Sequence, residues 1–479
     1  MAPILADGEA SPPMRRVVSL ACALGLVLAC VRPYTMTAVV TTALDWRECG
    51  GAFLCADLAV PVDHDEPDGP SLSLRVVRLP ATARDLRLGV LVVNPGGPGV
   101  SAVAYLRASW PRFGDSVRER FDLVAFDTRG TGGSTPLDCH DAFDSLMAQD
   151  PAPADDAAWQ GAVTASRAFA EECARKHGGL LPFMGTADSA RDLDQLRAAL
   201  LEERISYLGY SYGTALGAVY ASLFPERVRA LVLDGAIDPS FELLRFTREQ
   251  SIAVEDALTA YDTEARKKGW HGRESLDEVY RAAPRKSTVL YGAAEGLSSP
   301  PEGWQDLADA LARAREGDWR AFESLAHRYF GERGDGTRDL SVEAQLATLC
   351  ADLHRLRSAE AYRAALPEQA AASPHFGAGN LLSHLPCAFW PEPESGPLEL
   401  PDSVELAPAL VLANSGDPLT PHLWGERLTR RFPSATRVDV ESRGHTAFGR
   451  GDPCIDGLVE KYLLAPAPPA RSHCPSSAP

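Results

Sequence analysis

The stretch "ISYLGYSYGTALGAVYASLFPERV", from Ile205 to Val228, holds the pattern that decides the fold. It begins with an apolar run typical of a buried strand. The pentapeptide "GYSYG" follows, with Ser211 at its centre, and then a run of small residues at helical spacing. Glycines two positions before and after a serine let a strand turn sharply into a helix, whose N-terminus favours developing negative charge. The stretch therefore predicts that Ser211 is a nucleophile; an ordinary glycine-rich loop is the alternative.

Strand-like runs lie on both sides of this pentapeptide in the sequence. Residues 56–63 and 71–79 have the pattern of a β-hairpin, and later runs are continuously apolar, as buried parallel strands require. These later runs cover residues 88–94, 121–127 and 229–235, with helical patterns over 188–203 and 212–224. Alternation of strands and helices predicts an α/β protein, with a mostly parallel sheet and helices on both faces.

The pattern changes after Pro239. From residue 240 to about 400 the chain has helical spacing and no convincing strand, and strand patterns resume at 407–417 and 435–445. A helical block inserted between two strands of a parallel sheet lies over the carboxyl ends of the strands, where such sheets form their sites. The predicted organisation is a signal peptide (1–30), a first core part (31–239), a helical cap (240–400), a second core part (401–464) and a low-complexity tail (465–479).

A nucleophilic serine needs a base to take its proton. His445 stands in "ESRGHTAFG", just after the last strand-like run, and Gly444 lets this loop turn the imidazole back toward the sheet. A solvent-facing loop histidine is the alternative interpretation. The position favours His445 over the histidines of the helical block, which include His354, His375 and His384.

The base in turn needs an acid that orients it. Asp417 follows the preceding strand-like run, in "NSGDPLTP", although a Gly-Asp-Pro sequence is also ordinary turn chemistry. Asp234, at the end of the run over residues 229–235, is the rival acid. We favour Asp417, which places serine, aspartate and histidine in that order along the chain.

An oxyanion hole requires two backbone N–H groups aimed at the developing charge. The first is expected from Tyr212, the residue after the nucleophile. The second is expected from "NPGGPG" (94–99), a loop that follows the apolar run over residues 88–94. Its glycines let the backbone approach a substrate closely, so Gly96 or Gly97 is predicted to supply the amide. A plain Gly-Pro turn is the alternative.

The N-terminus has the features of an export signal. Arg15 and Arg16 precede "VVSLACALGLVLAC" (17–30), whose roughly 14 apolar residues are too few for a comfortable membrane span. The segment "VLAC" resembles a bacterial lipobox ending at Cys30. Two interpretations stay open, namely lipid attachment at Cys30 and simple cleavage nearby.

The cysteines agree with export. Of ten cysteines, eight lie beyond the predicted signal, and an even number there predicts disulfides in an oxidising compartment. The sequence has no C-x-x-C pair and no H-E-x-x-H motif, which argues against a metal site. The simplest pairing joins sequence neighbours: Cys49–Cys55, Cys139–Cys173, Cys350–Cys387 and Cys454–Cys474.

The formal net charge is −18 and the isoelectric point is about 5.1. Such a charge argues against a nucleic-acid partner or an anionic membrane surface, because phosphate groups would be repelled. Membrane attachment is therefore expected only through a lipid anchor, and the sequence leaves the oligomeric state open.

Five motifs in a fixed order carry a resemblance to a known family. They are "NPGGPG", "DTRGTGGS" (127–134), "GYSYGT", "NSGDPLTP" and "GHTAFG" followed by "DPC". Together they resemble the secreted tripeptidyl aminopeptidases, proline-iminopeptidase-like serine peptidases of the α/β-hydrolase superfamily, from about Trp46 to Cys474. The resemblance implies an α/β-hydrolase fold with a helical cap, a triad of Ser211, Asp417 and His445, and a C-terminal region typical of these aminopeptidases.

The sequence thus predicts an exported serine hydrolase that acts through an acyl-enzyme and needs no metal or cofactor. The favoured activity is removal of short peptides or residues from the N-terminus of a peptide, and a carboxylesterase acting on small acyl esters is the alternative. A non-catalytic binding protein on a hydrolase scaffold is a third. An aminopeptidase must also bind an α-ammonium group, for which a carboxylate is suited. Candidates in the helical block are Glu242, Glu249, Glu343 and Asp352.

Overall fold

The computed structural model describes residues 44–475, except residues 239, 241, 332–336, 394–397 and 406–407. The predicted signal peptide, with Cys30, lies outside the described residues. Within the described part of the chain, no helix is both long and apolar enough to cross a membrane.

One sheet forms the centre of the described chain, and its strands run in the order β1-β2-β3-β5-β4-β6-β7-β8-β9-β10. The β2–β3 hairpin is antiparallel, as predicted, while β4 to β9 pair in parallel, so the predicted α/β class is confirmed. The strands are β1 (Arg47–Glu48), β2 (Leu54–Pro61), β3 (Ser71–Leu79), β4 (Gly89–Asn94), β5 (Phe121–Phe126), β6 (Ile205–Tyr210), β7 (Val228–Asp234), β8 (Ala409–Gly416), β9 (Ala435–Arg443) and β10 (His473–Cys474).

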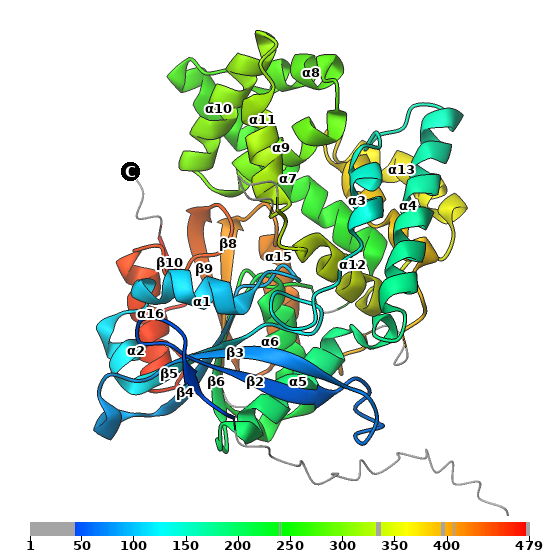
Figure 1. Cartoon of the computed structure of the whole chain (residues 1–479). Helices are drawn as coiled ribbons and strands as arrows, with labels where there is room; N and C mark the ends of the chain where they lie inside the picture. The colour runs from blue at the N-terminus through cyan, green and yellow to red at the C-terminus, as the bar shows by residue number, and fades with distance from the viewer. Residues whose placement is uncertain are drawn as a thin grey trace, which may run out of the picture. The chain divides into compact units, whose positions relative to one another are not determined.

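Helices cover both faces of this sheet (Figure 1). Every residue of β4, β5 and β6 is buried, which explains why these strands are mostly apolar in sequence. Alternate residues of β4 pack against different helices, with Val90 and Val92 in one hydrophobic core and Leu91 and Val93 in the other. The first core includes α5 (Thr186–Ala199), α6 (Tyr212–Leu223) and α15 (His422–Arg431), and the second includes α1 (Ala102–Ser109), α2 (Asp115–Arg120) and α16 (Pro453–Leu464).

The chain between β7 and β8 is helical wherever it has regular structure in the described residues. Figure 1 shows these helices stacked beyond one edge of the sheet. Several of them share a hydrophobic core of their own, which includes Leu258, Trp304 and Phe322. The helices are α7 (Leu243–Lys268), α8 (Arg273–Ala282), α9 (Lys286–Ser298), α10 (Glu302–Arg315), α11 (Arg320–Tyr329), α12 (Ser341–Asp352), α13 (Ala359–Ala372) and α14 (Gly377–Ser383).

Two helices that precede β6 in sequence also pack with this helical layer. Helices α3 (His140–Met147) and α4 (Asp156–His177) lie beside α12 and α13 in Figure 1. At the contact with α9, Ser287 Oγ donates a hydrogen bond to the carbonyl oxygen of Met147, at 2.7 Å. The sequence does not predict this contribution, because the contact joins segments far apart in the chain.

Four disulfides join Cys49 to Cys55, Cys139 to Cys173, Cys350 to Cys387 and Cys454 to Cys474. These are the four neighbour pairs expected from the sequence. The last of them fastens β10 to α16, and β10 pairs in parallel with β9. The C-terminal segment therefore adds a strand to the sheet edge, which its low-complexity sequence does not predict.

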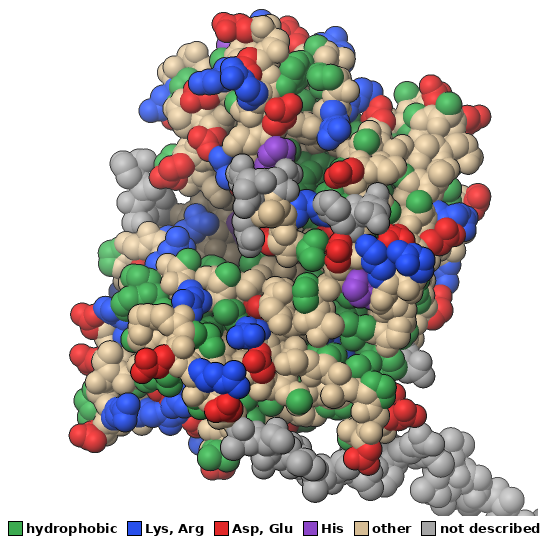
Figure 2. All heavy atoms as spheres, in the orientation of Figure 1, with side chains coloured by type: hydrophobic (Ala, Val, Ile, Leu, Met, Phe, Trp, Pro, Cys, Tyr) green, Lys and Arg blue, Asp and Glu red, His purple; other side chains and the backbone are tan. Residues whose placement is uncertain are grey.

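Acidic and basic side chains are interspersed over the face shown in Figure 2. On that face, the excess of acidic residues behind the net charge of −18 is not gathered into a single patch.

Candidate active site

Ser211 lies at the junction of β6 and α6 with φ 53° and ψ −125°, a backbone conformation that non-glycine residues rarely adopt. Its N–H donates to the carbonyl oxygen of Asp234, at 2.9 Å. A Cβ on Gly209 would approach the carbonyl oxygen of Gly213 to 2.2 Å, and one on Gly213 would approach the carbonyl oxygen of Asn94 to 2.6 Å. The turn therefore requires glycine at both positions, which is the physical basis of the pentapeptide.

Two loops at the carboxyl ends of the strands, where Ser211 also lies, bring a histidine and an aspartate together. His445 follows β9 and Asp417 follows β8, and His445 Nδ1 lies 3.0 Å from each carboxylate oxygen of Asp417. In this arrangement Nδ1–H donates to the carboxylate, and Nε2 is left free to accept a proton.

The carboxylate of Asp417 also accepts hydrogen bonds from its own turn and from the histidine loop. Its Oδ1 accepts from the N–H groups of Leu419 and Thr420, both at 2.9 Å, and its Oδ2 accepts from Thr420 Oγ1 at 2.8 Å and from Thr446 N–H at 3.2 Å. Burial by itself would raise the pKa of Asp417, but the nearby His445 and these donors hold the pKa below its usual range. The carboxylate is thus kept ionised beside the imidazole.

The rival acid, Asp234, has a different role at the end of β7. Its carboxylate accepts hydrogen bonds from the N–H groups of Ala447, at 2.9 Å, and Phe448, at 2.8 Å. Burial raises the pKa of Asp234 to about 6, against the effect of those two amides. Asp234 therefore holds the backbone that follows His445, while Asp417 holds the imidazole.

The end of β7 also connects the serine turn to the histidine loop. Gly235 has φ +71°, and a Cβ there would lie 2.9 Å from Thr420 Oγ1 and 3.4 Å from His445 Cε1. The preceding carbonyl, that of Asp234, accepts the N–H of Ser211. The serine turn and the loops of His445 and Asp417 therefore all border the end of β7.

The "NPGGPG" loop lies against the serine turn. A Cβ on Gly96 would come within 2.8 Å of Tyr212 N and 3.0 Å of Ser211 Cβ. The Gly96 N–H is already engaged, since it donates to Asn94 Oδ1 at 2.9 Å. By contrast, neither the Gly97 N–H nor the Tyr212 N–H has a hydrogen-bond partner among the described residues. The geometry thus favours Gly97 over Gly96 as the partner of Tyr212 in an oxyanion hole.

Comparison with known proteins identifies the family, because residues 89–452 match the family model described as alpha/beta hydrolase fold. The chain belongs to the α/β-hydrolase family. It is 32% identical to serine protease Hip1 of Mycobacterium tuberculosis, in an alignment that covers 90% of this chain and 91% of that protein. It is 30% identical to tripeptidyl aminopeptidase of Streptomyces lividans, over 89% of this chain and 86% of that protein.

A third relative carries the name of an esterase. The chain is 33% identical to carboxylesterase B of Mycobacterium tuberculosis, in an alignment that covers 88% of this chain and 86% of that protein. The predicted resemblance to the serine peptidases of the tripeptidyl aminopeptidase type is confirmed, and the protein is a serine hydrolase.

One family motif serves the scaffold of this α/β-hydrolase. In "DTRGTGGS", Asp127 accepts from Ser101 Oγ at 2.8 Å and from Gly133 N–H at 2.8 Å, and so ties its own loop to the start of α1. Arg129 is buried and its guanidinium lies 2.7 Å from the carboxylate of Asp192. These contacts fix the loop after β5 and do not belong to the serine turn.

The four carboxylates of the helical insertion that were candidates for binding an α-ammonium group each have a protein partner in this α/β-hydrolase. The pairs are Glu242 with Arg245 (3.7 Å), Glu249 with Arg427 (2.7 Å), Glu343 with Arg338 (2.8 Å) and Asp352 with the N–H of Thr186 (2.9 Å). Burial raises the pKa of Asp352 to about 7, against the hydrogen bonds from Thr186. A substrate cation at any of the four would have to share the carboxylate with its present partner or displace that partner.

Sequence reasoning missed Thr420, which donates to the acid, and Gly235, where a side chain would crowd Thr420 Oγ1. The signal for Thr420 was present, because a hydroxyl three residues after an aspartate in a turn can donate to its carboxylate. Gly235 gave no local signal, since its conformation matters only through its contact with the histidine loop.

Proposed function

We propose that this protein is an exported serine aminopeptidase that releases short N-terminal peptides or residues through an acyl-enzyme. The observation that carries the proposal is the bond from His445 to Asp417 at the sheet edge that also bears Ser211 in its strained turn. Relatives named as a serine protease and a tripeptidyl aminopeptidase support peptide bonds as the target.

In the proposed mechanism, His445 Nε2 takes the proton of Ser211 Oγ, and Oγ attacks the carbonyl carbon of the scissile bond. The N–H groups of Tyr212 and Gly97 stabilise the oxyanion. His445 then protonates the leaving amine, and a water molecule, activated by the same imidazole, releases the acyl product. Asp417 holds the imidazole in the tautomer with its proton on Nδ1 and stabilises the imidazolium.

The helical insertion is proposed to act as a cap that selects the acyl group. Two contacts of the insertion with the site support this role. The backbone N–H of His445 donates to the carbonyl oxygen of Ser298, at the end of α9, at 3.0 Å. A Cβ on Gly99, in the "NPGGPG" loop, would approach the carbonyl oxygen of Ser341, at the start of α12, to 2.1 Å. The insertion thus touches the loops that carry the base and the oxyanion amides.

Export is proposed from two features. Residues 17–30 have the pattern of a signal peptide, and four disulfides suit an oxidising compartment. Lipid attachment at Cys30 and cleavage near it are both kept as proposals, and mass spectrometry of the exported N-terminus distinguishes them.

A carboxylesterase that acts on small acyl esters is the second candidate function. It is favoured by the protein partners of the four carboxylates named above, since an ester substrate has no α-ammonium group to bind. The relative named carboxylesterase B supports the same alternative.

The first test is covalent labelling with a fluorophosphonate. The wild-type protein and Ser222→Ala, a matched control on α6, are expected to be labelled, and Ser211→Ala is not. Equal labelling of Ser211→Ala would show that another residue is the nucleophile.

The second test compares rates on tripeptidyl anilides with free and with acetylated amino groups. An aminopeptidase loses most of its rate when the amine is blocked, because the ammonium no longer meets its carboxylate. An unchanged rate would rule out the aminopeptidase and leave the esterase as the better proposal.

A further inference from the structure

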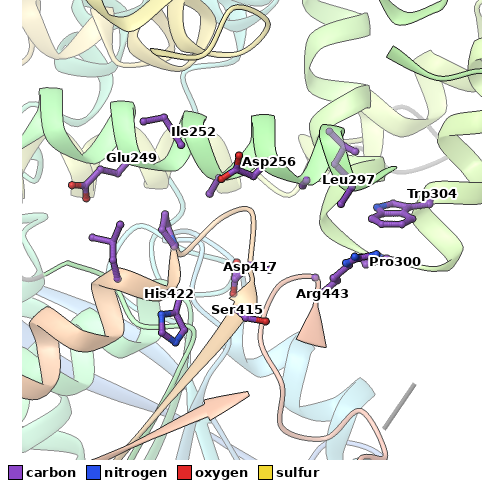
Figure 3. A pocket seen from close by; sticks show the side chains of 17 residues that line it. Glu249, Ile252, Asp256, Leu297, Pro300, Trp304, Ser415, Asp417, His422 and Arg443 are labelled. Atoms are coloured by element: carbon purple, nitrogen blue, oxygen red, sulfur yellow. The ribbon is translucent and has the colours of Figure 1, made fainter. Parts of the chain in front are cut away.

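A cavity of about 330 Å³ lies between α7 and the loops that follow β8 and β9 (Figure 3). Its volume falls at the small end of the range for ligand pockets, roughly 300–1,000 Å³. Asp417 and Gly444 lie on its wall, whereas Ser211 and His445 are not among the lining residues. The cavity therefore adjoins the acid side of the His445–Asp417 pair and is separate from the serine turn.

Two charged side chains on this wall lack partners of opposite charge. Asp256 comes from α7 and Arg443 from the end of β9, and neither side chain forms a hydrogen bond or an ion pair within the described part of the chain. The other charged or titratable residues of the wall are already bound: Glu249 to Arg427, Asp417 to His445, and His422 to Asp439.

The indole of Trp304 lies beside Arg443 at this wall. Trp304 is 5% exposed, and its Nε1–H is buried without a hydrogen-bond partner among the described residues. The Arg443 guanidinium lies 5.7 Å from the centre of the indole ring, a distance at which a cation and an aromatic face attract each other. Figure 3 places Trp304, Arg443 and Pro300 together at one end of the cavity and Asp256 on the helix above it.

The cavity offers an exposed carboxylate from one element and an exposed guanidinium, beside an indole, from another. A ligand that pairs with both charges has a cationic end and an anionic end. The apolar part of the wall, which includes Ile252 and Leu297, suits side chains between those ends.

We propose that this cavity binds a short peptide with free amino and carboxyl termini. The α-ammonium group pairs with Asp256, and the terminal carboxylate accepts from the guanidinium of Arg443, beside which the indole of Trp304 lies. The proposal rests on the proposed peptidase function for the source of such a ligand, since each cleavage generates a free carboxylate on a peptide that already has a free amine. The volume restricts the ligand to a few residues.

The site is distinct from the acyl subsite of the catalytic serine. A substrate bound as the acyl donor has its scissile carbonyl at Ser211 and no free carboxylate there, so it has no group for Arg443. A released peptide has both termini free and fits the two charges of the cavity.

The test measures binding to the full chain carrying Ser211→Ala, which prevents turnover. Calorimetric titrations use trialanine, N-acetyl-trialanine, trialanine amide and the peptide blocked at both ends. Trialanine is expected to bind, and each single block is expected to weaken binding by at least about tenfold, since each removes one charged hydrogen-bonded pair.

Two variants on the Ser211→Ala background assign each terminus. Asp256→Asn is expected to weaken trialanine binding and to remove the effect of acetylation, while the effect of amidation stays. Arg443→Gln is expected to remove the effect of amidation alone. Glu264→Gln on α7 and Arg430→Gln on α15 change the same charges outside the cavity and are expected to leave binding unchanged.

The proposal is overturned if trialanine shows no binding at millimolar concentration, or if neither cavity variant alters the response to blocking. Failure of the proposed function is a separate outcome. If wild-type protein hydrolyses only esters while trialanine binds as described, the aminopeptidase proposal fails and the cavity stands. If anilides with a free amine are cleaved but the binding pattern is absent, the cavity proposal alone fails.

Discussion

Asp234 ends β7 and Asp417 directly follows its parallel neighbour β8, and both residues are buried, with 0% and 3% exposed. Their pKa values nevertheless move in opposite directions. Asp417 has an imidazole at 3.0 Å and donors from two loops, and its pKa is below the usual range despite burial. Asp234 has two backbone amides and no cationic partner in contact, and burial raises its pKa to about 6.

The difference shows that burial alone does not decide which strand-end carboxylate can serve as the acid of a triad. Burial disfavours the charged form of both residues, and only a cationic partner with enough donors reverses that effect. The turn after β8 supplies those donors through Leu419 and Thr420. The geometry thus favours Asp417 as the orienting acid and gives Asp234 a structural role.

The largest expected effect separates these two acids in catalysis. Asp417→Asn is expected to lower kcat about ten-thousandfold, because an amide favours the wrong imidazole tautomer. Asp234→Asn is expected to lower kcat by less than about tenfold, because its oxygen can still accept from the histidine loop. The measurement is kcat on an activated ester, with circular dichroism to check folding. Equal losses for the two variants would contradict the division of roles.

The second prediction concerns stability and pH. The folded-state pKa of Asp234 is raised, so between pH 4 and 6 the folded protein binds more protons than the unfolded chain, and the unfolding free energy falls as pH rises. From an unfolded pKa near 3.9, a shift to about 6 corresponds to about 3 kcal/mol. Wild type is therefore expected to lose about that much stability relative to Asp234→Asn across this window.

Urea unfolding at several pH values measures this difference. The same measurement on Asp417→Asn is expected to give the opposite sign. The folded pKa of Asp417 is depressed, so its contribution is present above the unfolded pKa and is lost as pH falls through the folded pKa. If the difference in unfolding free energy between wild type and Asp234→Asn does not change with pH, burial does not raise the pKa of Asp234.

The third prediction concerns Gly235, which follows Asp234 at the end of β7 and lies beside Thr420. Gly235→Ala places a methyl group 2.9 Å from Thr420 Oγ1 and 3.4 Å from His445 Cε1, at φ +71°. It is expected to lower kcat by roughly 10- to 100-fold and stability by about 1–2 kcal/mol. Gly269→Ala is the matched control, because Gly269 has φ +69° with no atom within 4 Å of the new Cβ. That control is expected to lose stability alone, and equal kcat for both variants would exclude a steric effect on the imidazole.

The smallest expected effect comes from a single donor to Asp417. Thr420→Val removes the hydroxyl that lies 2.8 Å from Oδ2 and keeps the two backbone donors. Loss of one hydrogen bond to a charged group is expected to lower kcat about tenfold, or about 1.4 kcal/mol. Thr429→Val on α15, whose hydroxyl donates to Gly425, is the control and is expected to keep full kcat. A normal kcat for Thr420→Val would mean that the backbone donors suffice.

Local signals made much of the fold predictable. The apolar runs became β4, β5, β6 and β7 to within a residue or two, because a strand buried on both faces is built mostly from apolar side chains. The serine turn was predictable for a similar reason. Gly209 and Gly213 stand where any Cβ would strike backbone atoms, so the steric requirement is written into the local sequence.

Long-range contacts decided what the sequence left open. Helices α3 and α4 join the helical layer through contacts such as Ser287 with Met147, and β10 joins the sheet beside β9. The preference for Gly97 over Gly96 follows from a hydrogen bond that Asn94 makes with one of them. None of these has a periodic pattern or a spacing that a sequence could display.

The sequence by itself determined that a serine stands at a sharp strand-to-helix turn, and that an acid and a histidine follow later strands. Only the tertiary structure shows how Asp234 and Asp417 differ, because the imidazole and the donors that meet each carboxylate depend on how turns and loops are arranged in space. It also brought Asp256 and Arg443, from a helix and a strand far apart in the chain, to one cavity. Burial and backbone sterics act on each residue where it stands, whereas charge pairing depends on which neighbours folding supplies.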